Sequence, residues 1–185
     1  MNSRFEVYSC FIDIRKAFDS VDHEILMNKL LDCGIPEIYI NVIKYWYNNQ
    51  FVNIRYMSCL SERWKIKNGV RQGGVLSGLF FGIYIDSVID NVASMKYGCR
   101  LGIHDSSIIV YADDIVLMAP SWTGLQFLID ITCNEAKKLK LEVNKVKSKS
   151  MLFSNNYNKY DKLIHVRVDG KEIESVTPIN TSVSW

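Results

Sequence analysis

The sequence predicts an α+β fold of ferredoxin-like topology, in which helices pack on one face of an antiparallel sheet. Three observations lead to this prediction. Strands and helices follow one another in the order β-α-α-β-β-α-β-β-α-β, which mixes hairpins with crossover helices. Short Ile/Val-rich runs lie close enough together to pair as hairpins. Of the 185 residues, 48% are apolar, so the chain can bury a substantial core.

The first part of the chain contains a strand, two helices and a hairpin. An alternating apolar strand lies within Glu6–Ile14 and ends at Asp13. Asp22 is a good N-cap for a helix that Gly34 ends, and Pro36 begins a second helix. Residues 51–57 and 63–67 then predict a β-hairpin around Ser58-Cys59-Leu60-Ser61.

The second part begins with a long apolar helix from Ser77 to about Ile89. Two β-branched runs, 107–110 and 115–118, follow as strands joined by a tight turn. A helix is expected from about Thr123 to Lys138, with one apolar face. The last expected elements are strands at 149–154 and 163–168 and a turn at Asp169-Gly170.

Composition excludes several classes of protein. Five widely spaced cysteines without a CxxC or a Cys/His pair exclude a zinc site and indicate reduced, mostly buried thiols. The longest apolar run, Val75–Ile85, is too short to span a bilayer, and the N-terminus has no signal-peptide pattern. We therefore expect an intracellular protein with no membrane partner, while its oligomeric state is left open.

The net charge of +2 indicates little about partners, but the charge distribution is uneven. Lysines crowd into a short segment in which Glu142 is the one acid: Lys137, Lys138, Lys140, Lys145, Lys147 and Lys149. Two interpretations fit this run. It is either a solvated helix face or a surface that follows a nucleic-acid backbone.

The turn Tyr111-Ala112-Asp113-Asp114 is the most informative feature of the chain. Two adjacent carboxylates beside an apolar core repel each other, and a divalent cation would relieve that repulsion. In a ferredoxin-like sheet the first strand lies beside this hairpin, so Asp13 is expected to converge on Asp113 and Asp114. Such a set suits two hard cations about 3.5–4 Å apart and points to phosphoryl transfer.

Four blocks in this order resemble motifs A to D of the reverse transcriptase palm of non-LTR (LINE-type) retrotransposons. Motif A is FIDIRKAFDSVDH (11–23), motif B is GVRQGGVLS (69–77), motif C is YADDIVLMA (111–119), and motif D includes Asn144-Lys145-Val146-Lys147-Ser148. The resemblance implies a polymerase palm fold and RNA-directed DNA synthesis. It also implies an RNA template, a DNA primer and deoxynucleoside triphosphates as partners, two Mg²⁺ ions (or Mn²⁺) as cofactors, and a nuclear or cytoplasmic location.

The resemblance also assigns roles to individual residues. Asp13 and Asp113 would hold the metals, with Asp114 beside them and the Ile14 carbonyl as a further ligand. Lys147 would act as the acid for the departing pyrophosphate. The remaining residues would bind substrate: Phe18 as a steric gate against a ribose 2′-hydroxyl, Arg71, Gln72 and Gly73 against the nucleotide and template, and Tyr111 beneath the primer end. For Phe18, Arg71 and Lys147 an ordinary core or surface role stays open.

The chain departs from the family pattern in several places. Gly78 stands where the family usually has proline, and Lys140 where it often has glycine. The segment 178–185 has no primer-grip motif. We expect residues 1–155 to form the palm and residues 156–185 a hairpin and tail leading toward a missing thumb, so that the chain alone has little or no activity.

Two alternative functions remain. One is a non-catalytic nucleic-acid-binding remnant of the same fold. The other is a different palm-type enzyme, such as a nucleotidyl cyclase, which also uses carboxylates at strand ends. The Arg71-Gln72-Gly73 loop and the position of Phe18 favour template-directed synthesis.

Overall fold

The computed structural model describes residues 6–154 and 165–176, and it divides the chain into two compact units. One unit comprises the described parts of residues 1–15 and 85–185 and contains the main sheet. The other comprises residues 16–84. The expected division into residues 1–155 and 156–185 stays a prediction, because much of the second segment lies outside the described residues.

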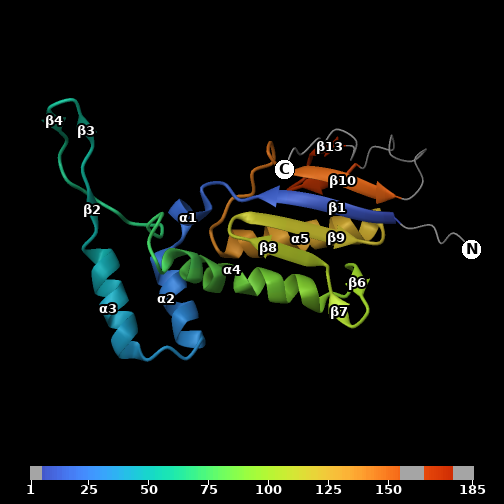
Figure 1. Cartoon of the computed structure of the whole chain (residues 1–185), viewed down its shortest axis with the longest axis horizontal. Helices are drawn as coiled ribbons and strands as arrows, with labels where there is room; N and C mark the ends of the chain where they lie inside the picture. The colour runs from blue at the N-terminus through green and yellow to red at the C-terminus, as the bar shows by residue number, and fades with distance from the viewer. Residues whose placement is uncertain (1–5, 155–164, 177–185) are drawn as a thin grey trace, which may run out of the picture. The chain divides into compact units, whose positions relative to one another are not determined.

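The main sheet has five strands in the order β13-β10-β1-β9-β8 (Figure 1). Its strands are β1 (Glu6–Asp13), β8 (Ile108–Tyr111), β9 (Asp114–Ala119), β10 (Lys149–Ser154) and β13 (Glu174–Val176). Strands β10, β1, β9 and β8 pair antiparallel, whereas β13 adds to β10 in parallel. The predicted antiparallel sheet, with β1 beside the β8–β9 hairpin, is therefore confirmed.

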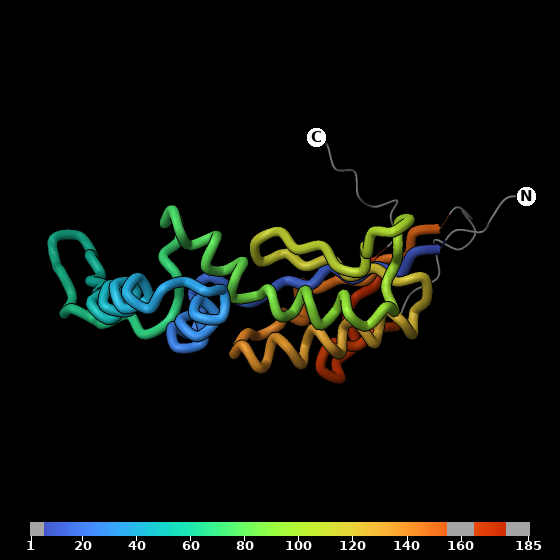
Figure 2. The backbone as a smooth tube through the Cα atoms, turned by 90° about the horizontal axis from the view of Figure 1, so that it is seen from below, coloured from blue at the N-terminus to red at the C-terminus, as the bar shows by residue number. Residues whose placement is uncertain are grey.

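One face of this sheet forms the core of its unit. Cys10 and Ile12 of β1 are buried beside Leu117 and Ile115, their direct partners on β9. Helix α5 (Trp122–Lys138) contacts β1 and β9 and buries its own apolar stripe, which includes Leu125, Leu128, Ile129 and Cys133. Figure 2 shows α5 running along the sheet. Ser121 caps the helix, because its Oγ accepts a hydrogen bond from the Gly124 N–H at 3.1 Å.

Helix α4 (Ser77–Ser94) from Ile85 onward and two short hairpins complete the described part of this unit. β6 (Arg100–Leu101) pairs with β7 (His104–Asp105), and the sequence did not predict this ladder. β11 (Arg167–Val168) pairs with β12 (Lys171–Glu172) around Asp169-Gly170, as predicted. Residues 163–164 of the expected 163–168 strand and the whole of 178–185 lie outside the described residues, whereas residues 165–166 are described and form no strand.

The other unit contains α1 (Ala17–Ser20), α2 (His23–Asp32), α3 (Glu37–Asn48) and the first residues of α4 (Ser77–Ser94). Asp22 is the predicted N-cap of α2, since its carboxylate accepts from the backbone N–H groups of Glu24 and Ile25. Gly34 follows α2 with φ of 78°, which suits glycine.

The predicted hairpin of this unit is present, but its turn is tighter than expected. β2 (Phe51–Val52) pairs with β5 (Trp64–Lys65), and β3 (Arg55–Tyr56) pairs with β4 (Cys59–Leu60). The turn is therefore Met57-Ser58, with Met57 at φ of 53°, and the predicted turn Ser58–Ser61 is wrong. Ser61 instead ties the two arms together, because its Oγ accepts from the Ile54 N–H at 2.8 Å.

None of the helices in residues 6–154 and 165–176 combines the length and the apolar character needed to cross a lipid bilayer.

Candidate active site

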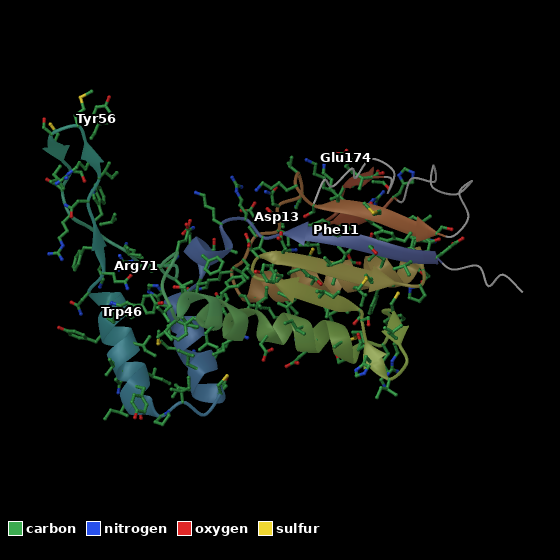
Figure 3. The ribbon with its side chains drawn as sticks, in the orientation of Figure 1. Phe11, Asp13, Trp46, Tyr56, Arg71 and Glu174 are labelled. Carbon is green, nitrogen blue, oxygen red and sulfur yellow. The ribbon has the colours of Figure 1, made fainter. Side chains whose placement is uncertain are left out.

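Two of the three predicted acids face each other across the sheet. β1 ends at Asp13, β9 begins at Asp114, and the antiparallel register pairs these two residues directly. Directly opposed residues of an antiparallel pair point to the same face, with Cβ atoms about 4.5–5.5 Å apart. Phe11 and Val116 form the preceding pair on that face. Figure 3 labels Phe11 and Asp13 near the end of β1.

Asp113 lies in the turn of the β8–β9 hairpin. Tyr111 pairs with Asp114, so the turn consists of Ala112 and Asp113. Ala112 has φ of 53°, a left-handed conformation that is costly for a residue other than glycine. The Asp113 carbonyl accepts a hydrogen bond from the Ile14 N–H at 3.4 Å. The turn that carries Asp113 therefore contacts the chain immediately after Asp13.

The backbone of Ile14 also lies next to the predicted acids. Its N–H is directed to Asp113, and the N–H and C=O of a strand residue point to the same side. The Ile14 side chain is buried, and the Ile14 backbone forms an isolated antiparallel β-bridge with Val143 on the side away from Asp113. This geometry agrees with the Ile14 carbonyl as a ligand, which stays a prediction. Tyr111 has a side chain open to solvent, 82% exposed, and its expected place beneath a primer also stays a prediction.

A third segment fixes the backbone of Asp13. The Asn144 N–H donates to the Asp13 carbonyl at 2.8 Å, and the Asp13 N–H donates to Ser148 Oγ at 3.3 Å. Ser148 Oγ in turn donates to the Asn144 carbonyl at 2.8 Å, and Ser148 is fully buried. Both backbone groups of Asp13 are thus held by the turn 144–148.

The same turn places Lys147 beside Asp13. Asn144 Oδ1 accepts from the backbone N–H groups of Val146 and Lys147 at 3.3 and 3.4 Å, as in an Asx turn. Lys147 Nζ lies 3.6 Å from Asp13 Oδ1, and the Lys147 side chain is 69% exposed. Asp13, Asp114 and Lys147 line a cavity of about 360 Å³ together with Phe11, Ile12, Ile115 and Val116. The site thus presents two carboxylates and the ammonium group of the exposed Lys147 side chain to a small polar ligand.

The donor set can be tested against a divalent cation. Within the described residues, no group of three or more His, Cys, Asp and Glu side chains is arranged to hold a metal ion. A hard cation such as Mg²⁺ needs only one or two protein carboxylates and keeps its waters for substrate phosphates. The opposed carboxylates of Asp13 and Asp114, with Asp113 in the adjoining turn, are therefore of the right chemical kind.

The other predicted site residues lie in the unit of residues 16–84. The ring of Phe18 is half-buried and stacks on Phe81, with ring centroids 5.0 Å apart. Gln72 Nε2 donates to Asp19 Oδ1 at 3.3 Å. Arg71 has an exposed side chain, and its carbonyl accepts from Ser77 Oγ and from the Gly74 N–H. Gly73 has φ of 76°, so glycine suits this loop.

The lysine run is largely neutralised by acids of its own unit. Lys137 and Lys145 pair with Asp169, Lys138 with Glu135, Lys147 with Asp13, and Lys149 with Glu174. These pairs favour the solvated, locally paired interpretation over a continuous cationic track. Asn144 and Ser148 belong to the motif D block but had no role assigned from the sequence, although an Asn that precedes a Ser/Lys turn is a recognisable Asx-turn signal.

Comparisons with known proteins agree on one family. Residues 3–179 match the family model described as reverse transcriptase (RNA-dependent DNA polymerase). The chain is 30% identical over 139 residues to the Retrovirus-related Pol polyprotein from type-2 retrotransposable element R2DM of Drosophila melanogaster. That match covers 74% of this chain and 13% of the relative. The R2 polyprotein of Bradysia coprophila is 28% identical over 185 residues, which cover 98% of this chain and 21% of the relative.

Among solved structures, telomerase from Candida tropicalis in complex with a TWJ fragment of telomeric RNA has a similar fold. The TM-score is 0.61 at 15% identity, over 82% of this chain and 26% of the telomerase chain. At this identity the likeness shows the fold alone, which is the polymerase palm. The chain spans about an eighth to a fifth of the length of the two retrotransposon proteins.

Proposed function

The chain belongs to the reverse transcriptase (RNA-dependent DNA polymerase) family, and we propose that it is the catalytic palm of a non-LTR retrotransposon polymerase. The proposed reaction joins a deoxynucleoside triphosphate to the 3′-hydroxyl of a DNA primer under the direction of an RNA template. The family description, RNA-dependent DNA polymerase, and the retrotransposon relatives support RNA as the template. The primer, the nucleotides and an intracellular setting belong to the same proposal.

One observation carries the proposal. The register of β1 and β9 opposes Asp13 to Asp114, while the turn 144–148 holds the Asp13 backbone and brings Lys147 to 3.6 Å from its carboxylate. Phosphoryl transfer depends mainly on positioning and on charge stabilisation, and this edge of the sheet supplies both from rigid elements.

Asp13, Asp113 and Asp114, together with the Ile14 carbonyl, would hold two Mg²⁺ ions, or Mn²⁺ in their place. Such ions, when bound, stabilise the attacking and departing oxygens of an in-line displacement. Lys147 would donate a proton from Nζ to the departing pyrophosphate. Phe18 would exclude a ribose 2′-hydroxyl, Arg71, Gln72 and Gly73 would contact the nucleotide and template, and Tyr111 would support the primer end.

The alternative of a non-catalytic nucleic-acid-binding remnant rests on the lysine run. That run is mostly engaged in local ion pairs, so its capacity to bind phosphates is reduced. The acids of the site, in contrast, lie together at one end of β1 and β9. This contrast favours the catalytic proposal over the remnant.

Mn²⁺ binding and primer extension by the 185-residue chain test the proposal together. We expect Mn²⁺, followed by electron paramagnetic resonance, to bind the wild-type chain and to bind Asp13→Asn at least tenfold more weakly. Asp86→Asn is the matched control, because Asp86 is an exposed acid of α4 and its substitution removes the same charge. Equal Mn²⁺ affinity in all three proteins would contradict the metal-dependent function and favour the remnant.

Primer extension then tests the reaction itself. With an RNA template, a DNA primer and Mg²⁺ or Mn²⁺, we expect slow addition of the templated deoxynucleotide. Asp13→Asn and Asp113→Asn should abolish the addition, while Asp86→Asn should not. Addition that ignores the template, or that survives both active-site substitutions, would refute the assignment.

A further inference from the structure

His23 makes a specific contact to which the sequence assigned no function. It is the first residue of α2, and its Nε2 lies 2.8 Å from the carbonyl oxygen of Gly69. A carbonyl oxygen can only accept, so Nε2 carries the proton and donates this hydrogen bond. The His23 ring also packs against Tyr47 of α3, with ring centroids 4.5 Å apart. The imidazole is thus held in one orientation by a ring contact and a hydrogen bond.

Gly69 is anchored on its other side by the turn that follows Phe18. Its N–H donates to the Val21 carbonyl at 2.7 Å, and the Val70 N–H donates to the Phe18 carbonyl at 2.8 Å. Gly69 and Val70 are buried. Gly69 has φ of 95°, and a Cβ there would lie 3.0 Å from both Cα and the carbonyl oxygen of Asp19. The two backbone segments therefore approach as closely as glycine permits.

This contact joins the segment that contains Phe18, the proposed steric gate, to the loop that contains the proposed nucleotide-binding residues Arg71 and Gln72. Phe18 and Asp19 precede Val21, whereas Arg71 and Gln72 directly follow Val70. Gln72 Nε2 returns to Asp19 Oδ1 at 3.3 Å, and the Arg71 carbonyl is held by Ser77 Oγ and the Gly74 N–H. Because all of these residues lie within residues 16–84, their arrangement is a property of one compact unit.

We infer that His23 is a positioning residue for deoxynucleotide selection. By holding the Gly69 carbonyl, it keeps the 69–73 loop fixed against the Phe18 turn. The proposed steric gate and the proposed nucleotide-contacting side chains then keep a constant spacing. This inference rests on the proposed function, because selection has meaning only if the chain binds nucleoside triphosphates.

Two substitutions separate the hydrogen bond from the ring. His23→Phe keeps a ring against Tyr47 and removes the donor. His23→Gln removes the ring and keeps an N–H that can reach the Gly69 carbonyl. His104→Phe is the control, because His104 is an exposed histidine of β7 in the other unit. Thermal melting confirms that each variant is folded before the comparison.

The first readout is amide hydrogen exchange at Gly69 and Val70 in the 185-residue chain, which requires no polymerase activity. In His23→Phe we expect exchange to accelerate about two- to tenfold, the effect of losing one hydrogen bond. His23→Gln and His104→Phe should stay near the wild type. Unchanged protection in His23→Phe, or equal loss in His23→Gln, would show that the hydrogen bond does not anchor the loop and would overturn the inference.

The second readout is the preference for deoxynucleotides over ribonucleotides in primer extension. We expect His23→Phe to raise KM for the deoxynucleotide more than it lowers kcat, to reduce the preference severalfold, and to be rescued in His23→Gln. Equal preference in wild type and His23→Phe would overturn the selection role. If the wild-type chain makes no DNA, the proposed function fails and the selection role fails with it, while the exchange result still decides whether His23 anchors the loop.

Discussion

Replacing Lys140 with glycine should stabilise the protein. Helix α5 ends at Lys138, and Lys140 has φ of 55°, in the left-handed region. The Leu141 N–H donates to the Ala136 carbonyl at 2.8 Å, and the Lys140 N–H donates to the Lys137 carbonyl at 3.0 Å. These two bonds form a Schellman motif, in which glycine is the usual residue at the position of Lys140. The glycine that the family often carries here therefore has a local physical reason.

Two opposing effects set the magnitude. A residue other than glycine costs about 1–2 kcal/mol in the left-handed conformation. Glycine gives back about 0.5–1 kcal/mol of this gain because it makes the unfolded chain more flexible. We therefore expect Lys140→Gly to raise the free energy of unfolding by about 0.5–1 kcal/mol. For a chain of this length the midpoint of thermal unfolding should rise by about 1–4 °C.

Urea unfolding followed by circular dichroism measures this difference. Lys140→Ala is the matched control, because it removes the same side chain and keeps the strained backbone. Lys138→Gly, inside the last helical turn, should instead lower the free energy of unfolding by about 1 kcal/mol. The reasoning is refuted if Lys140→Gly is no more stable than Lys140→Ala.

Three further predictions concern an ion pair, the reactivity of the thiols and the support of Asp13. The hydrogen bond from Lys137 lowers the pKa of Asp169 below its ordinary value of 3.8, so this interaction stabilises the fold at neutral pH and is lost as the pH falls through the lowered pKa. In Asp169→Asn the midpoint of thermal unfolding should therefore fall less between about pH 5 and pH 3 than in the wild type. Parallel pH profiles of the two proteins would exclude the Asp169–Lys137 interaction as a source of acid sensitivity. Burial raises the pKa of Cys10 to about 12 and that of Cys133 to about 11, so iodoacetamide at pH 8 should modify the exposed Cys33 and Cys59 first. Mass spectrometry measures the order of labelling, and early labelling of Cys10 would contradict the described core. Ser148→Ala removes the acceptor of the Asp13 N–H, so it should lower the free energy of unfolding by about 1–3 kcal/mol and weaken Mn²⁺ binding. A loss of stability with Mn²⁺ affinity intact would show that Ser148 does not position Asp13.

Local chemistry explains why most elements could be predicted from the sequence. Asp22 caps α2 with its own carboxylate, and Asp169-Gly170 turns the chain with φ of 48° and 75°. Ser77 begins α4 as predicted, although Gly78 follows it. These features depend on residues a few positions apart, so their signals are present in a short window of sequence.

Features that depend on distant partners were not predictable in the same way. The lysine run had two open interpretations because Asp169 and Glu174, which neutralise Lys137, Lys145 and Lys149, lie far along the chain. His23 had no assigned role because its acceptor, Gly69, is 46 residues away. The β6–β7 ladder was missed for another reason, since Arg100–Leu101 and His104–Asp105 lie outside the β-branched and aromatic runs that predicted the other strands.

The position of the acids shows how the core determines the site. Successive strand residues point to opposite faces, so two adjacent aspartates cannot both face Asp13 while both belong to a strand. The chain resolves this conflict by beginning β9 at Asp114 and leaving Asp113 in the turn.

The register that opposes Asp114 to Asp13 is the same register that buries Ile115 beside Ile12 and Leu117 beside Cys10. A shift of one residue would place Ile115 or Asp113 opposite Asp13 and would turn the apolar set of β9 toward the open face. The acids are therefore held in place by the burial of their apolar neighbours, and the repulsion between them is opposed by the packing of β1 and β9 against α5.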